Sequence, residues 1–222
     1  KFFQILDKRL ELCKKALLLR VELLKRITSD VSPIHWQYGA IARLKPGETI
    51  EKFIYGGYAT LSLGYIGIYE ATLLTKHCSH TTPEGRKFAM RIMDSFNEHI
   101  AAWKKETNIG FALYGTPAEN LTNLFCKIDK ARFGSIKDVT DKGYYTNCYH
   151  VDVREPINVF DKFKFEADFE EKSTGGCISY AEIPNMTHNI PAVLTMVQFI
   201  YDHIAYAEFN TKLDYCHECG FD

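Results

Sequence analysis

The sequence lacks several features that would each assign it to a broad class. No apolar run approaches the 18 or so residues that a bilayer-spanning helix needs, so we expect no membrane segment. Neither charge is in excess: 27 Lys and Arg residues stand against 28 Asp and Glu residues, a net charge of −1 at pH 7. Without a global basic field, we expect neither nucleic acid nor a membrane surface as a partner. We also find no repeat or low-complexity tract, and we expect no signal peptide at Lys1.

The cysteine pattern argues against a disulfide framework. Most of the 7 cysteines stand alone in apolar or strand-like surroundings, which is typical of a protein kept in a reducing cytoplasm. His77, Cys78 and His80 are close in sequence, but neighbouring residues rarely form a tetrahedral metal site. We therefore interpret that segment as a polar loop.

The pattern that is present favours an α/β protein. With 222 residues, of which 46% are hydrophobic, the chain is large enough for a sizeable core. Apolar residues at helical spacing predict amphipathic helices over residues 3–27 and from Thr82 onward, the second with a buried stripe ending at Trp103. The first helix begins without a cap, so we expect the chain to be part of something longer. Strands alternate with helices, which favours mostly parallel strands with crossover helices.

The strand-to-helix turn at Gly115 is the first candidate site. Residues 109–114 are apolar and aromatic and predict a buried strand, which Gly115 ends. Thr116 is predicted to cap the next helix, with Pro117 at its first position. Free N–H groups around residues 118–120 would then suit an anion, and a side chain at Gly115 would block the ligand or forbid a positive φ. The alternative is an ordinary turn with a Thr-Pro cap.

Residues 144–153 alternate like a strand and carry side chains suited to chemistry. In a strand, Cys148, His150 and Asp152 would share one face, with Asn147 on the other. A nucleophilic thiolate with its base is one interpretation of Cys148 and His150. Side chains two residues apart in a strand stand parallel and rarely bond, so we favour a structural histidine.

The last residues contain a Cys-x-x-Cys motif, formed by Cys216 and Cys219 and followed by Gly220. In this knuckle two thiolates bind one metal, so we predict a zinc site that needs two further ligands. Two unpaired thiols or a redox pair are the alternative interpretation.

Five motifs together resemble those of the anaerobic (class III) ribonucleoside-triphosphate reductases, a family of glycyl radical enzymes. The resemblance runs from an opening Phe-x-x-x-Leu-Asp-x-Arg-Leu helix to the end of the chain. In chain order the motifs are SLGYIG at 62–67, GFALYGTPAENLT at 110–122, GYYTN at 143–147, GGCISY at 175–180 and DYCHECGF at 214–221.

The resemblance implies a fold and a division of the chain. Enzymes of this family fold as a ten-stranded α/β barrel, so residues 1–207 would be the second half of the catalytic barrel. Residues 208–222 would begin the C-terminal zinc and glycyl-radical region. The radical-bearing cysteine is expected upstream of Lys1 and the radical glycine downstream of Asp222, so this chain alone is expected to be inactive.

The resemblance also implies a reaction, cofactors and partners. The family reduces the 2′-hydroxyl of a ribonucleoside triphosphate by glycyl and cysteinyl radical chemistry. A partner activase, an S-adenosylmethionine iron–sulfur enzyme, installs the glycyl radical, and formate or a thioredoxin-type reductant supplies the electrons. A cytoplasmic homodimer is expected for the full-length protein.

For the site, the resemblance implies that substrate phosphates bind at Gly115, Thr116, Ala118, Glu119 and Asn120. Tyr114 and Glu119 lie at the same strand end and would face the ribose as catalytic groups, with a first-turn cap as the alternative role of Glu119. Two other functions stay open: a non-catalytic half-barrel, and another glycyl radical enzyme, similar to pyruvate formate-lyase, that acts on a small acid. The knuckle of Cys216 and Cys219 favours the reductase.

Overall fold

The computed structural model describes residues 1–115 and 117–211, without the side chain of Glu119. The chain divides into two compact units, one of residues 1–63 and 94–113, the other of residues 64–93 and 114 onward. The division falls inside three elements: β1 (Thr60–Gly64), α4 (Pro83–Thr107) and β2 (Gly110–Gly115). The candidate site lies in the second unit.

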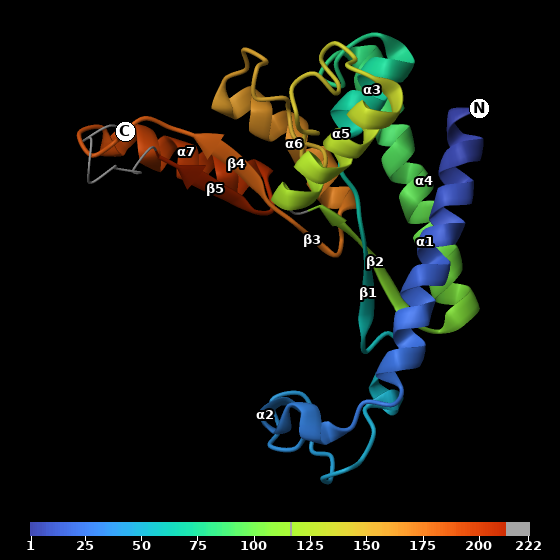
Figure 1. Cartoon of the computed structure of the whole chain (residues 1–222). Helices are drawn as coiled ribbons and strands as arrows, with labels where there is room; N and C mark the ends of the chain where they lie inside the picture. The colour runs from blue at the N-terminus through green and yellow to red at the C-terminus, as the bar shows by residue number, and fades with distance from the viewer. Residues whose placement is uncertain (116, 212–222) are drawn as a thin grey trace, which may run out of the picture. The chain divides into compact units, whose positions relative to one another are not determined.

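The first unit is built on two long helices. α1 (Phe2–Leu24) runs beside the part of α4 that belongs to this unit, residues 94–107 (Figure 1). Lys14 Nζ of α1 lies 2.6 Å from Glu106 Oε2 of α4. Trp103 of α4 is buried and packs edge-on against Phe111 of β2. The unit also contains most of β1 and β2 and three short helices: η1 (Ser29–Val31), α2 (Pro33–Trp36) and η2 (Glu51–Phe53).

The second unit combines helices with short parallel strands. Its further elements are α3 (Ile68–Lys76), α5 (Glu119–Phe133), α6 (Val159–Lys172), β3 (Gly176–Cys177), β4 (Ser179–Glu182), α7 (Ile190–His203) and β5 (Ala207–Asn210). The end of β2 pairs in parallel with β3, in a sheet of order β1-β2-β3. β4 and β5 also pair in parallel, and α7 connects them. Parallel strands joined through helices confirm the predicted α/β class.

α6, α7 and the β4–β5 pair share one hydrophobic core. Its buried members are Phe163 of α6, Ala181 of β4 and Ile204 at the end of α7. Figure 1 shows α7 beside β4 and β5. The sequence also predicts a helix that starts at residues 189–191, because apolar residues follow there at helical spacing. α7 confirms this helix and has Pro191 in its first turn. Val197, which the pattern places inward, is 49% exposed, so that part of the prediction is wrong.

Three local predictions are wrong. Residues 144–153 form a loop, in which Asn147 makes an isolated bridge to Ile66. The alternation there reflects polar side chains that bind buried charges, not the two faces of a sheet. α5 has Ala118 as its N-cap in place of Thr116. α1 ends at Leu24, a few residues earlier than the apolar spacing predicts.

The amphipathic helices α4 and α5 differ in the burial of their apolar stripes. The stripe predicted for α4 is buried as expected: Phe88, Ile92, Phe96, Ile100 and Trp103. The corresponding stripe of α5 stays between 44% and 48% exposed: Leu121, Leu124, Phe125 and Ile128. Among the described residues, no helix has the length and apolar character that a transmembrane helix requires.

Candidate active site

The last residues of strand β2 differ in their exposure to solvent. Tyr114 is 40% exposed, whereas Leu113 and Gly115 on either side of it are buried, as the alternation of a strand requires. Parallel pairing places Tyr114 opposite Gly176 of β3. The phenol of Tyr114 is therefore accessible at the carboxyl end of a strand, which is the edge where α/β proteins bind ligands.

Gly115 is enclosed by side chains of the core. A Cβ at this position would lie 2.9 Å from Tyr65 Oη and 3.0 Å from both Ser173 Oγ and Tyr149 Cε1. Tyr65 and Ser173 are joined by a hydrogen bond of 2.8 Å. The backbone of Gly115 is not in the positive-φ region, so the conformational reason given for this glycine is wrong. Glycine fits here because the neighbouring side chains leave no room for a Cβ.

The first turn of α5 follows at Ala118. Its N–H donates to Asn147 Oδ1 at 3.0 Å, and its carbonyl accepts the first N–H bonds of the helix. The amides of Glu119 and Asn120 occupy first-turn positions, for which an α-helix offers no acceptor. Together with the positive end of the helix dipole, these amides are the part of the turn best suited to an anion.

A buried ion cluster holds the loop that follows α5. Lys142 Nζ lies 2.6 Å from Glu70 Oε1 and 2.5 Å from Asp152 Oδ2, and all three side chains are at most 5% exposed. Glu70 Oε1 also accepts from the backbone N–H and the hydroxyl of Thr146, each at 2.8 Å. Burial opposes the charge on Asp152, but hydrogen bonds from Arg154 and Lys142 outweigh it and hold its pKa well below the usual range. The cluster fixes the loop against α3.

Glu166 of α6 fixes the other end of the same loop. Its Oε1 accepts from the Val151 N–H at 3.0 Å, and its Oε2 lies 2.8 Å from Lys162 Nζ. His150 Nδ1 is 3.4 Å from Glu166 Oε1. Burial opposes the charge on Glu166, but the neighbouring His150 and Lys162 outweigh it and lower the pKa of this carboxyl to about 2. Glu166 is therefore an ionised structural anchor.

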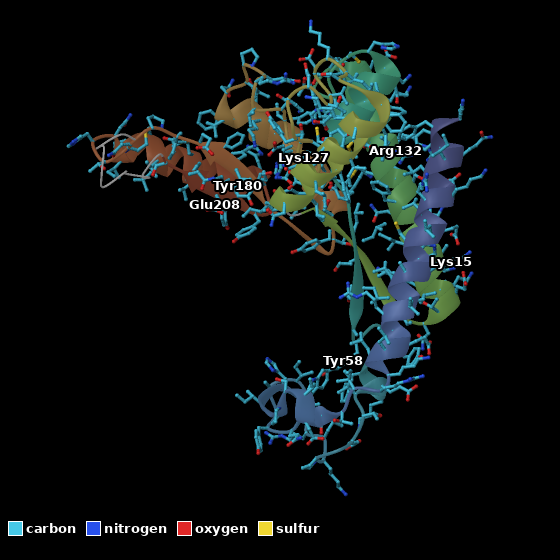
Figure 2. All side chains as sticks on the ribbon, viewed as in Figure 1. Lys15, Tyr58, Lys127, Arg132, Tyr180 and Glu208 are labelled. Carbon is cyan, nitrogen blue, oxygen red and sulfur yellow. The ribbon has the colours of Figure 1, made fainter. Side chains whose placement is uncertain are left out.

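A cavity of about 790 Å³ lies beside the start of α5. Pro117 of the turn and Asn147 of the loop both line it. Tyr180 and Glu208 line it from the paired strands β4 and β5, where Figure 2 shows them close together. Binding sites for small molecules typically measure about 300–1,000 Å³, and the volume of this cavity lies within that range.

The cysteine and histidine candidates of this region have structural roles. Burial raises the pKa of the Cys148 thiol to about 12, which disfavours a nucleophilic thiolate at neutral pH. Cys148 has a φ of 41° in the loop, so it and His150 do not share a strand face. His80 is buried, with its Nε2 3.0 Å from the carbonyl oxygen of Tyr149. Within the described part of the chain, no group of three or more His, Cys, Asp or Glu residues is arranged to hold a metal ion.

The structure places part of the predicted site. Gly115, Ala118 and Asn120 lie together at the turn, next to Tyr114. Outside the described residues lie Thr116, the side chain of Glu119, Cys216 and Cys219. Asn147 has a role that was not predicted: its side chain accepts a hydrogen bond from the Ala118 N–H, about 30 residues away in the sequence. The polar Thr146-Asn147 pair at the end of the aromatic GYYTN segment is the sequence feature from which this role could have been inferred.

The fold of this chain is similar to that of solved reductases. One solved anaerobic ribonucleotide reductase superposes on this chain with a TM-score of 0.76 and 23% sequence identity. The superposition covers 98% of this chain and 32% of the reductase chain. A second match is the anaerobic ribonucleotide reductase of Thermotoga maritima with glycerol in the active site, with a TM-score of 0.76 and 23% sequence identity. That superposition covers 99% of this chain and 34% of the Thermotoga maritima chain. The fold is therefore that of a fragment of the anaerobic ribonucleotide reductase barrel.

Comparison of the amino-acid sequence with known families identifies the family of this chain. The family model of the anaerobic ribonucleoside-triphosphate reductase matches residues 1–222, and the chain belongs to this family. Two relatives named anaerobic ribonucleoside-triphosphate reductase, from Salmonella typhimurium and Haemophilus influenzae, are 40% and 41% identical to this chain, each over 99% of its length. The chain spans about a third of their length, 31% and 32%.

Proposed function

We propose that this chain is a part of an enzyme that reduces ribonucleoside triphosphates to 2′-deoxyribonucleotides. The observation that carries the proposal is the match of the whole chain to the reductase family. The turn at Gly115 adds a site of the right kind, because helix amides at the end of a strand suit the phosphates of a nucleotide. In this reaction the 2′-hydroxyl leaves as water, and two electrons come from formate or a thioredoxin-type reductant.

In the proposed site, the substrate phosphates lie at the first turn of α5. The amides of Glu119 and Asn120 donate to them, while Gly115 lets Tyr65 and Tyr149 pack closely behind the turn. Thr116 is proposed to add a hydroxyl contact. Tyr114 extends its phenol from the same strand end, toward the ribose. Glu119 is proposed to assist proton transfer at the ribose hydroxyls.

The radical and metal parts of the proposed enzyme lie elsewhere. A glycyl radical, installed by an S-adenosylmethionine iron–sulfur activase, supplies the one-electron chemistry in the complete, dimeric, cytoplasmic protein. Cys216 and Cys219 are proposed as two of four zinc ligands, because thiolates at Cys-x-x-Cys spacing suit a structural zinc. We further propose that residues 1–207 belong to the barrel and residues 208–222 to the zinc and radical region.

The phosphate site is tested by Asn120→Asp in the complete reductase. A carboxylate in the first turn favours the helix through its dipole, so the fold is kept, but it repels the phosphates. We expect the KM for a ribonucleoside triphosphate to rise about tenfold with little change in kcat. Glu119→Gln and Tyr114→Phe should instead lower kcat and leave KM nearly unchanged.

Steady-state kinetics with each variant, checked for equal glycyl-radical content by electron paramagnetic resonance, separate these outcomes. An unchanged KM in Asn120→Asp would place the phosphates away from this turn. Full kcat in both Glu119→Gln and Tyr114→Phe would remove these two residues from the catalytic machinery.

A further inference from the structure

Asn147 is the side chain that connects the loop after α5 to the start of that helix. Its Oδ1 accepts from the Ala118 N–H at 3.0 Å, and its backbone bridges to Ile66 in front of α3. The residues around it are fixed in turn, since Thr146 is bonded to the buried carboxylate of Glu70. Asn147 therefore reaches the turn from a rigid support.

This bond determines which amides are left for a ligand. Ala118 is the N-cap of α5, and its N–H is already used by Asn147. The two amides that follow are held in a fixed direction because the residue before them is anchored. Asn147 also lines the cavity of about 790 Å³ together with Pro117, so its side chain lies between the anchored turn and open space.

A neutral amide suits this position better than a carboxylate does. Either group accepts the Ala118 N–H, and a carboxylate is normally the stronger acceptor near a helix N-terminus. An ionised group here would, however, place a negative charge one residue from the amides that are offered to an anion. Asparagine keeps the acceptor and leaves the site free of that charge.

We propose that Asn147 is a positioning residue that holds the first turn of α5 for the phosphates of the substrate. The proposal rests on the proposed function, since it presumes that nucleotide phosphates bind at this turn. It adds a residue from a distant segment to the site, and it explains why that residue has a neutral side-chain amide in place of a carboxylate.

The experiment uses two variants of Asn147 in the complete, activated reductase. Asn147→Asp keeps the acceptor and adds a charge, so the KM for a ribonucleoside triphosphate should rise about tenfold at low salt and recover partly at high salt. Asn147→Ala removes the acceptor without adding charge, so KM should rise severalfold at every salt concentration. The inhibition constant of an unphosphorylated ribonucleoside should stay within about twofold in both variants, because it makes no phosphate contact.

Asn123 provides a matched control. It lies on α5 and donates from Nδ2 to the Gly143 carbonyl at 2.9 Å, so it also connects the helix to this loop. It lies five residues after Ala118, more than one helical turn away, where the effect of the helix end has declined. Asn123→Asp and Asn123→Ala should keep the parent KM within about twofold.

The outcomes separate this inference from the proposed function. If Asn120→Asp raises KM but Asn147→Asp does not, the phosphates bind at the turn and Asn147 does not position it. If neither raises KM, the site itself is elsewhere and both proposals fail. A parallel loss of ribonucleoside binding in the Asn147 variants would show general disruption, and it would also overturn the positioning role.

Discussion

Gly115 is closely enclosed by side chains at the candidate site. The Tyr65 hydroxyl, the Ser173 hydroxyl and the Tyr149 ring all lie within 3.0 Å of where a Cβ would stand. This contact arises from residues far apart in the chain, so a local sequence pattern cannot reveal it. The sequence indicates that glycine is needed here, and the structure shows that the reason is packing.

We therefore predict that Gly115→Ala destabilises the protein. The added methyl group has to displace Tyr65 or Ser173, and overpacking of this kind costs about 1–3 kcal/mol. Urea unfolding of the chain measures the loss. Gly64→Ala is the control: its Cβ would meet only the Tyr114 carbonyl oxygen at 3.9 Å, so its unfolding free energy should stay within about 0.5 kcal/mol of the parent. Equal stability of the two variants would contradict this explanation.

Buried charges are the residue-level feature that the sequence did not predict. Lys142 and Asp152 belong to the loop after α5, and Glu70 belongs to α3. Charged residues are usually exposed, so nothing in the sequence indicated that these three are buried together. A charge is buried only where partners compensate it, and those partners are brought together by the fold. Pairing of this kind follows from tertiary structure and not from spacing along the chain.

The elements that the sequence predicted best are those whose local signals agree. β2 combines apolar and aromatic residues with a terminating glycine, and α4 combines a Pro-Glu start with a long apolar stripe. Both occur as expected. Residues 144–153 show the opposite case, because an alternating pattern without a neighbouring strand to pair with gives a loop.

α5 shows how much of an element's environment depends on the rest of the protein. α5 occurs where the apolar residues recur at helical spacing, and Gly134, which follows its last residue, has a positive φ of 83° that glycine adopts without strain. Its apolar stripe nevertheless stays about half exposed in this chain. Periodicity specifies that a helix has an apolar face, but it does not specify which surface covers that face.

For the whole molecule, the order of the motifs was more informative than any single one. A strand-turn-helix with a Thr-Pro pair, or one Cys-x-x-Cys, occurs in many families. The five motifs in one order pointed to the anaerobic reductases, and the match over residues 1–222 confirms that family. The α/β class was also predictable, whereas the contacts of Asn147 and the enclosure of Gly115 required the structure.

The proposed metal site gives a prediction for the complete protein. If Cys216 and Cys219 are two of four thiolate ligands, the purified protein should contain about one zinc per chain, and Cys216→Ala should lose it. Metal analysis by mass spectrometry measures this directly. Cys126→Ala serves as a control, because that cysteine is buried in α5. Retention of one zinc in Cys216→Ala would assign the metal to other residues.

The measurement that tests the central proposal most directly is product analysis with the complete protein. The protein is activated without oxygen and incubated with a ribonucleoside triphosphate and either formate or a thioredoxin-type reductant, and its glycyl radical is quantified by electron paramagnetic resonance. We predict the corresponding 2′-deoxyribonucleoside triphosphate, detected by mass spectrometry, in an amount that exceeds the radical many times over. A full radical signal without any deoxyribonucleotide, under either reductant, would contradict the proposed function.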